Sequence, residues 1–495
     1  MSQITQKIAK NASVLFGSQL IMWLLTMALT IVMPRYLGAA GVGKIHFATS
    51  LWTIIGVIAA FGIDTLLIKE IARQPARTAA LFGSALVLRC LLFLIGYLGL
   101  IVTLEFFGYP TDTIIIVCLI GIANLIRQIV ALTQATLQGL ERMELSSSGE
   151  ILGNALYTLV GVALLLNGWS IYAIAVLLIV TVALNLSVQL FFLHRLYPLR
   201  LNFRPHDAFV LLKTGWPYLL SSFFLVAYMQ VDVIILSALV DEQAIGWYSA
   251  AYRLFGTFLF IPSVYIMAAF PVLSRLHLND QGSLHRLISK SIDTIFLLSI
   301  PIGFGMTMIA NPLVTLIFGP EFANSGPILA VLGIVLILTY QNILIGHFLI
   351  SMDRQNVWTK VMVVATIATI PLDMVLIPWC EATFGNGALG GAISFGLTEL
   401  GMMLVGLYLL PTGALTRANL WTALRIMVAG SVMALVVWRF DNLFIAIPVF
   451  LGVVSYLTVV LLLRIIPKED FTFLQSLIQP FLNKVRRPQP EAVRS

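Results

Sequence analysis

The stretch QVDVIILSALVDEQAIGWYSAAYRL, from Gln230 to Leu254, places two apolar runs on either side of a short acidic turn. The first run carries a single aspartate, Asp232, and the second run carries a single arginine, Arg253. Such runs are typical of α-helices that cross a bilayer, which need about 20 mainly apolar residues. The stretch therefore predicts two neighbouring membrane helices with opposite charges inside them.

The composition of the whole chain agrees with a membrane protein. Of its 495 residues, 59% are hydrophobic and only 10% are charged, whereas soluble domains carry roughly 25% charged residues. The mean hydropathy is +0.98. The sequence predicts an all-α integral membrane protein with about fourteen transmembrane helices. The expected helices are residues 11–33, 43–63, 79–103, 113–138, 150–167, 169–193, 210–238, 244–270, 288–310, 325–351, 357–378, 386–410, 419–438 and 442–465.

The placement of Lys and Arg predicts the orientation, because positively charged loops stay in the cytoplasm. Most of the 29 basic residues fall in alternate loops and near both ends of the chain. Only Arg35, Lys44 and Arg439 fall on the other side. We therefore expect a multi-pass protein of the cell (inner) membrane with both termini in the cytoplasm. The net charge of +7 follows from this pattern and needs no nucleic-acid partner.

An internal repeat divides the chain. RYLGAAGVGKIHFATSL (35–51) aligns without gaps on ALVDEQAIGWYSAAYRL (238–254), and Gly43 falls on Gly246. Two halves of six helices have the same orientation, so the repeat is parallel, with a binding site expected between the halves. The expected units are an N-terminal lobe (1–205), a C-terminal lobe (206–412), two further helices (413–466), and a cytoplasmic amphipathic segment with a disordered tail (467–495).

The charges within the apolar runs are candidate functional residues, because a charge at the centre of a membrane helix costs about 3 kcal/mol and normally faces a bundle interior or a watery cavity. Asp232 and Arg253 lie at similar depths in adjacent helices. Two interpretations stay open: a salt bridge that joins the two helices, or a charged lining near the outer mouth of a cavity.

A polar face on the 113–138 helix is a second candidate. Asn124, Arg127, Gln134 and Gln138 recur at helical spacing on one side of that helix. They form either interhelical hydrogen bonds or a water-accessible wall, which suits an arginine better.

The remaining charged candidates are less central. Arg89 lies closer to the inside, where it could snorkel, so we expect Arg127→Ala to impair transport more than Arg89→Ala. Lys44 starts its helix at the outer interface, where surface placement is the alternative to a cavity role. Asp373 and Glu399 are candidates to bind a coupling proton or cation, or they pair with polar neighbours.

Signatures of an enzyme are weak or missing. GNGALG, residues 385–390, fits a dinucleotide-binding pattern but follows no strand. The three cysteines are scattered, which argues against a disulfide framework or a metal site. We therefore expect no enzymatic activity, no cofactor and no bound metal.

Several motifs resemble one family. VDVIILSAL with AIGWYSAAYRL, FPVLSRL, KNASVLFGSQL with PRYLGAAGVG, FGIDTLLIKEIAR, ISMDRQNVWTK and LIPWCEATFGNGALGGAISFGLTEL are similar to stretches of the Wzx-type polysaccharide flippases of the MATE-like (MOP) superfamily. The resemblance covers residues 8–465. It implies a two-lobed bundle that moves an oligosaccharide on polyprenyl pyrophosphate from the inner to the outer leaflet by alternating access, for surface polysaccharide or O-antigen synthesis.

The resemblance also assigns residues and partners. It matches the family's acid to Asp232 and a basic residue to Arg253. It implies a cationic cavity for the pyrophosphate, contact with membrane lipid, a proton or sodium counter-ion, and polysaccharide polymerase machinery as a partner. The alternative is a cation-coupled multidrug exporter of the same superfamily, which would have an acidic, aromatic-lined cavity.

Overall fold

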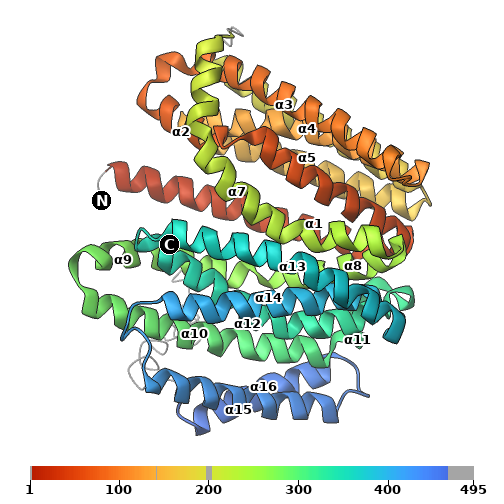
Figure 1. Cartoon of the computed structure of the whole chain (residues 1–495), viewed down its shortest axis with the longest axis vertical. Helices are drawn as coiled ribbons and strands as arrows, with labels where there is room; N and C mark the ends of the chain where they lie inside the picture. The colour runs from red at the N-terminus through yellow and green to blue at the C-terminus, as the bar shows by residue number, and fades with distance from the viewer. Residues whose placement is uncertain (1–2, 141, 197–202, 466–495) are drawn as a thin grey trace, which may run out of the picture.

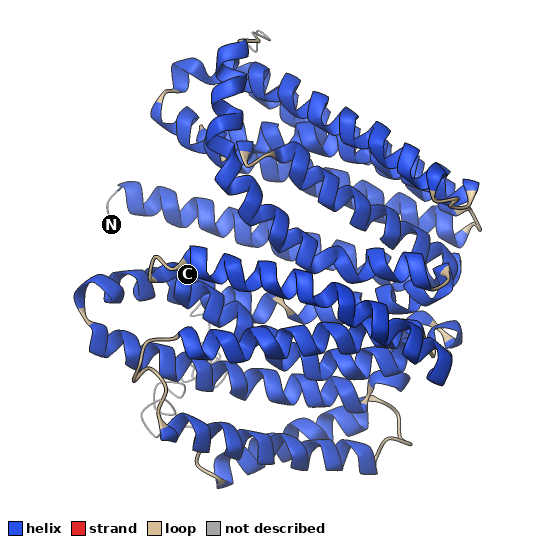
Figure 2. Cartoon of the chain, in the orientation of Figure 1, coloured by secondary structure: helices blue, strands red, loops and turns tan. Residues whose placement is uncertain are grey.

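The computed structural model describes residues 3–140, 142–196 and 203–465, so the expected tail at 467–495 lies outside the described residues. Within these ranges the regular elements are helices joined by short loops (Figure 2). The helices are α1 (Gln3–Ala60), α2 (Ile63–Arg73), α3 (Thr78–Phe106), α4 (Thr111–Gly139), α5 (Met143–Leu166), α6 (Ile171–Leu196), α7 (Pro205–Leu239), α8 (Glu242–Phe258), α9 (Phe260–Asn279), α10 (Gln281–Met308), α11 (Ala310–Phe318), α12 (Ser325–Ser351), α13 (Gln355–Phe384), α14 (Gly387–Leu409), α15 (Arg417–Arg439) and α16 (Ala446–Leu462).

The predicted all-α membrane fold is confirmed, with differences in detail. The expected helices 11–33 and 43–63 join in α1, where Gly38 has a φ of 68° that changes the chain direction without a loop. The expected helix 244–270 is divided between α8 and α9. By length and composition, 11 helices of the described chain can cross a membrane, and α16 is a shorter apolar helix. Fourteen crossings therefore stay a prediction.

The helices pack in groups that follow the chain order (Figure 1). The helices α1 and α3–α6 pack against one another, as do α8, α10 and α12–α14. The long helix α7 contacts α1 and α3 on one side and α13 and α14 on the other, and α15 packs on α10 at the far end. The division into lobes at 205/206 and 412/413 stays a prediction.

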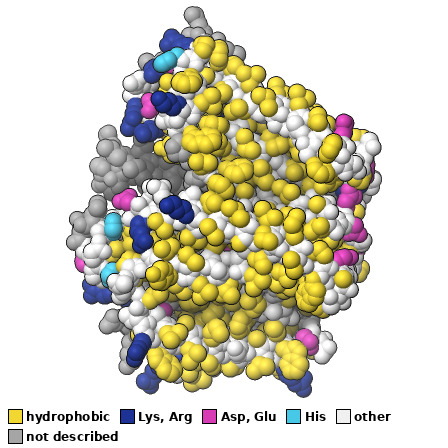
Figure 3. Space-filling view, in the orientation of Figure 1, with side chains coloured by type: hydrophobic (Ala, Val, Ile, Leu, Met, Phe, Trp, Pro, Cys, Tyr) yellow, Lys and Arg dark blue, Asp and Glu magenta, His cyan; other side chains and the backbone are white. Residues whose placement is uncertain are grey.

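The surface has the polarity expected of a membrane protein (Figure 3). Apolar side chains cover the middle of the view, along the length of the helices. Lys and Arg gather mostly at the edge where the N-terminus lies, and Asp and Glu mostly at the opposite edge, where α11 lies. The positive-inside pattern would put the first of these edges in the cytoplasm, although the orientation itself stays a prediction.

Where α1 and α8 cross, a glycine of each helix lies against the backbone of the other. A Cβ at Gly43 would lie 2.0 Å from the carbonyl oxygen of Glu242, and a Cβ at Gly246 would lie 1.9 Å from the carbonyl oxygen of Ala39. Ala39 and Glu242 stand at the same offset in the chain as Gly43 and Gly246. The two contacts therefore exchange under the internal repeat, as contacts across a two-fold axis do. Only glycine lets the two backbones approach this closely.

Candidate functional site

Two adjoining cavities lie among the N-terminal helices. The inner cavity, as we name the one between α4, α5 and α6, has a volume of about 400 Å³. The central cavity has a volume of about 380 Å³ and is also lined by α1 and α8. Arg127, Asn154, Tyr157 and Leu178 line both. The two cavities are therefore parts of one polar space that begins within the first half and reaches the second half at α8.

Two arginines from different halves of the chain face this space. Arg127 on α4 is surrounded by protein but open to both cavities. Arg253 on α8 is half-buried and lines the central cavity. Within the described part of the chain, neither guanidinium has a hydrogen-bond or ion-pair partner. The phenol group of Tyr157, which lines both cavities, lies near both guanidinium groups. Two cations that line one cavity suit an anionic ligand by their charge.

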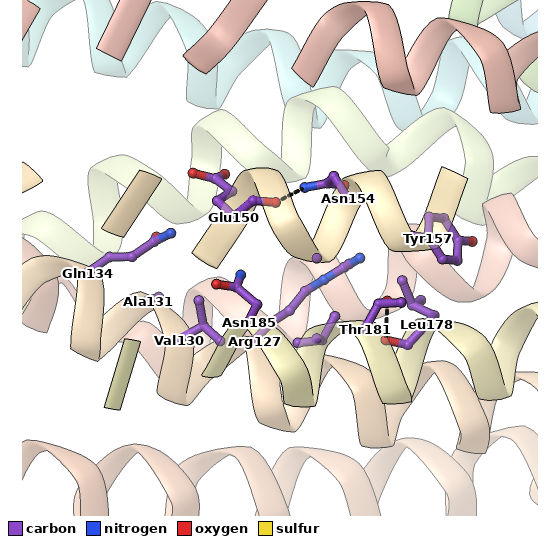
Figure 4. Close-up of a pocket in the computed structure, with 12 residues that line it drawn as sticks. Arg127, Val130, Ala131, Gln134, Glu150, Asn154, Tyr157, Leu178, Thr181 and Asn185 are labelled. Carbon is purple, nitrogen blue, oxygen red and sulfur yellow. Dashed lines mark hydrogen bonds between the residues drawn. The ribbon is translucent and has the colours of Figure 1, made fainter. Parts of the chain in front are cut away.

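The inner cavity carries uncharged hydrogen-bonding groups and one acid (Figure 4). Glu150 and Asn154 project from α5, and Asn185 projects from α6. The Asn154 side chain donates to the backbone oxygen of Glu150 over 3.1 Å. The Asn185 side chain accepts a hydrogen bond from Gln189 over 2.8 Å. These fixed amides, together with a free carboxylate, suit a ligand that carries many hydroxyl groups.

Of the two interpretations left open for Asp232 and Arg253, the salt bridge is wrong, and the cavity lining holds for Arg253 but not for Asp232. Asp232 is 4% exposed, and its carboxylate accepts a hydrogen bond of 3.1 Å from the hydroxyl of Tyr248. Its other oxygen has no partner. Arg253 is five residues beyond Tyr248 on α8, about 500° of helical rotation and hence about 140° around the helix. The arginine therefore points into the central cavity while Asp232 faces the second half.

Asp232 belongs instead to an acidic cluster with Asp373 and Glu399, two candidates on α13 and α14. The carboxyl groups of Asp232 and Asp373 interact with each other. Both carboxylate oxygens of Asp373 are buried without a hydrogen-bond partner among the described residues. Glu399 accepts hydrogen bonds from Tyr228 over 2.8 Å and from the side chain of Asn342 over 2.7 Å. The orphaned oxygens of Asp232 and Asp373 are where a proton or a small cation could bind. In the described chain, no group of three or more His, Cys, Asp or Glu residues is arranged as a metal site.

Arg89 does not line either cavity, and it does not snorkel. Its side chain is fully buried and forms an ion pair of 2.8 Å with Asp64. The guanidinium also donates to the backbone oxygens of Gln128, over 3.1 Å, and Ala60, over 3.2 Å. Arg89 therefore joins α3 to α1, α2 and α4, and its expected role in the cavity is corrected to a structural one.

Lys44 is also paired. Its ammonium group contacts the carboxylates of Asp112, at the start of α4, and Glu242, at the start of α8. From α1, six residues after the kink at Gly38, it joins the starts of α4 and α8 rather than lining a cavity.

Of the polar face expected on α4, Arg127 and Gln134 line the inner cavity, while Asn124 and Gln138 line neither cavity. The Asn124 side chain donates to the backbone of Ile120 on its own helix, over 2.9 Å. The distance along the helix from Asn124 to Gln138 is about 21 Å at 1.5 Å per residue, so a row of this length extends beyond both ends of the cavity.

The lining residues that were not expected from the sequence include Glu150, Asn154, Tyr157 and Asn185. The first three recur on α5 at spacings of four and three, the same signal that identified the face of α4. The polar positions of α5 and α6 could therefore have been found by the same reasoning.

The described helices and their internal polar space define a membrane protein with a known transporter fold. The chain superposes on the lipid II flippase MurJ, in an inward closed conformation, with a TM-score of 0.70 at 15% identity, over 92% of this chain and 99% of that chain. It superposes on an inward-facing MATE family multidrug transporter of the MOP superfamily with a TM-score of 0.61 at 14% identity, over 78% and 93%. The polysaccharide biosynthesis protein family matches residues 8–277, and the chain belongs to this family.

Two proteins of Haloferax volcanii are similar in sequence. The probable flippase AglR is 24% identical over 404 residues, which cover 78% of this chain and 80% of AglR. The probable low-salt glycan biosynthesis flippase Agl15 is 25% identical over 176 residues, 35% of this chain and 36% of that protein. The resemblance to polysaccharide flippases that the motifs carry is confirmed.

Proposed function

We propose that this protein is a flippase that moves oligosaccharides linked to polyprenyl pyrophosphate across the membrane by alternating access. The observation that carries the proposal is the pair of unpaired arginines, Arg127 and Arg253, in the central cavity. A pyrophosphate offers several anionic oxygens, and guanidinium groups match phosphate oxygens with bidentate, charge-assisted hydrogen bonds. Because the arginines come from α4 and α8, a bound headgroup would contact both halves of the chain.

The edge predicted to face outward is closed in a way that suits alternating access. The reciprocal glycine crossing of α1 and α8 lies there, beside the ion pairs of Lys44. Arg35 on α1 donates to the backbone oxygen of Ile317 on α11 over 2.6 Å, and the amide of Ala39 donates to the Glu321 carboxylate over 2.9 Å. These contacts join the first half to the second. Outward opening would require them to separate together.

The acidic cluster of Asp232, Asp373 and Glu399 is the proposed site of the coupling ion, a proton or sodium. Partly unpaired buried carboxylates are costly unless a proton or a cation neutralises them. Loading the cluster would therefore stabilise it. The membrane would be the cell membrane with both termini in the cytoplasm, and polysaccharide polymerase machinery would receive the product.

The alternative function is the export of cationic drugs, since a MATE multidrug transporter shares the fold. The charges of the polar space oppose it. Arg127 and Arg253 face the cavities, whereas Asp232, Asp373 and Glu399 line neither of them. Two unpaired arginines repel a cationic drug and attract a pyrophosphate.

The test is a flipping assay in liposomes that contain the purified protein. The probe is a polyprenyl pyrophosphate linked to a fluorescent disaccharide, and dithionite added outside measures the fraction of probe in the outer leaflet. The wild type should transfer the probe, and Arg253→Ala should transfer it at least tenfold more slowly. Arg425→Ala, at an exposed arginine of α15 remote from both cavities, is the control. Equal rates for liposomes with and without the wild-type protein would refute the proposal.

A further inference from the structure

The polar space is asymmetric in charge along its length. Arg253 lines only the central cavity, and Glu150 lines only the inner cavity. Arg127 and Tyr157 lie where the two meet. Figure 4 shows Glu150 and Gln134 toward one end of the inner cavity, and Tyr157 at the other end, with Arg127 reaching toward it. The cavity therefore runs from an anion-binding end to an end with a single acid.

The length of α5 sets the distance between these ends. Glu150 and Tyr157 are seven residues apart on α5, a rise of about 10.5 Å. A volume of about 400 Å³ falls within the range of roughly 300–1,000 Å³ that is usual for small-molecule sites. If a pyrophosphate binds between Arg127 and Arg253, the sugar attached to it enters the inner cavity.

Glu150 stands free in that cavity. Within the described residues its carboxylate has no hydrogen-bond or ion-pair partner, and the Gln134 amide beside it has none either. Asn154 and Asn185 hold the opposite walls. A free carboxylate accepts hydrogen bonds from hydroxyl, acetamido or ammonium groups, and an amide offers both donors and acceptors. A second carboxylate brought into this space would meet a like charge in a poorly hydrated environment.

We propose that the inner cavity is the subsite for the sugar next to the pyrophosphate, and that Glu150 makes it selective for neutral or amino sugars over uronic acids. This inference rests on the proposed flippase function and adds the residue that determines its specificity. Arg127 does not cancel the effect, because it lies at the junction, where the pyrophosphate engages it. The selectivity therefore comes from the end of the cavity that is remote from the phosphate.

The experiment compares two probes that differ at one carbon. They are a short-chain polyprenyl pyrophosphate linked to glucose and the same lipid linked to glucuronic acid, in which a carboxylate replaces the hydroxymethyl group. Binding to the purified protein is measured by isothermal titration calorimetry. The wild type should bind the glucosyl probe about tenfold more tightly, because like-charge contacts in a desolvated site cost more than one kcal/mol. Glu150→Gln should bring the two affinities within about threefold, through tighter binding of the glucuronosyl probe.

Two further variants test the role of Glu150: one should strengthen the preference for the glucosyl probe, and the other is a control. Gln134→Glu adds a second carboxylate to the inner cavity and should increase the preference for the glucosyl probe, which tests the inference even if Glu150→Gln folds poorly. Glu105→Gln removes an exposed acid of α3 and should leave both affinities unchanged.

The outcomes separate the two proposals. Equal binding of both probes by the wild type, or a preference that survives in Glu150→Gln, would overturn the role of Glu150 and leave the flippase function standing. Failure of the wild type to bind either probe would overturn the flippase function, and the sugar subsite with it.

Discussion

Replacing Arg127 and Arg89 by alanine, one at a time, should separate the arginine proposed to bind the headgroup from the arginine that stabilises the fold. Both lie within apolar helices of the first half, and the sequence separates them only by depth and by the polar face around Arg127, not by their partners. In the structure Arg127 is unpaired and open to the cavities, while Arg89 is buried and bonded to Asp64, Gln128 and Ala60. The two substitutions should therefore fail by different routes.

The magnitudes follow from the contacts. Breaking a buried ion pair costs about 3–5 kcal/mol. Because the side chain of Asp64 keeps 36% of its exposure and stays partly hydrated, we expect Arg89→Ala to cost about 3 kcal/mol of folding free energy, at the lower end of that range. Arg127→Ala removes no hydrogen bond or ion pair of the guanidinium to the described residues, so its effect on folding should stay within about 0.5 kcal/mol. A lost charge-assisted hydrogen bond of about 1.5–3 kcal/mol should weaken headgroup binding by roughly 10- to 100-fold.

The assay pairs thermal unfolding in detergent with the liposome flipping rate per folded molecule. Arg89→Ala should lower the unfolding midpoint by several degrees and keep most of the rate of the molecules that remain folded. Arg127→Ala should keep the wild-type midpoint and lose at least nine-tenths of the rate, about the loss expected from one charge-assisted hydrogen bond. Equal midpoints for the two variants, or an Arg127→Ala protein that flips at the wild-type rate, would refute the assignment.

Gly246→Ala places a Cβ 1.9 Å from the backbone oxygen of Ala39 and should cost about 1–3 kcal/mol by overpacking. Gly256→Ala on the same helix meets nothing within 4 Å, so similar unfolding midpoints for these two variants would contradict a close helix crossing. Asp373→Asn should make the flipping rate independent of an imposed proton or sodium gradient. Headgroup affinity should change by no more than about twofold, which is less than the loss of one hydrogen bond. A gradient response as large as that of the wild type would exclude Asp373 from the coupling site. Lys44→Gln should lower stability by at most about 1 kcal/mol, because its two carboxylate partners are partly exposed, and a larger loss than that of Arg89→Ala would reverse the ranking of the two ion pairs.

The helices could be predicted closely because lipid imposes a simple rule on sequence. The expected apolar runs are helical in the structure, although some pass from one helix into the next, since a membrane span has to satisfy its backbone hydrogen bonds internally. The junctions were harder. Gly38 joins two expected helices into α1, and the short helices α2 and α11 have too few residues to give a membrane signal.

The interaction partners of the charged residues could not be predicted from how deep each residue lies in its membrane helix. Asp232 and Arg253 do lie in adjacent helices, but depth does not specify which way a side chain points around its helix. The pairing of Arg89 with Asp64 was missed because Asp64 belongs to a separate short helix that the apolar pattern does not reveal. Helix positions follow from hydrophobicity, whereas pairings depend on the packing of several helices at once.

The opposite charges of the stretch 230–254 belong to two different sites that share one helix. One face of α8 carries Tyr248, which bonds to Asp232 and stacks on Tyr252 at a ring distance of 5.9 Å. The face about 140° away carries Arg253, which lines the central cavity. Under the proposed function, an ion at the acidic cluster and a ligand at the cavity would both act on the position of α8, and coupling would require both to favour the same position. The glycine crossing with α1 lies near the start of this helix. The proposed ion site, the proposed headgroup site and the contacts at the edge predicted to face outward thus all involve α8, so this one helix is enough to connect them.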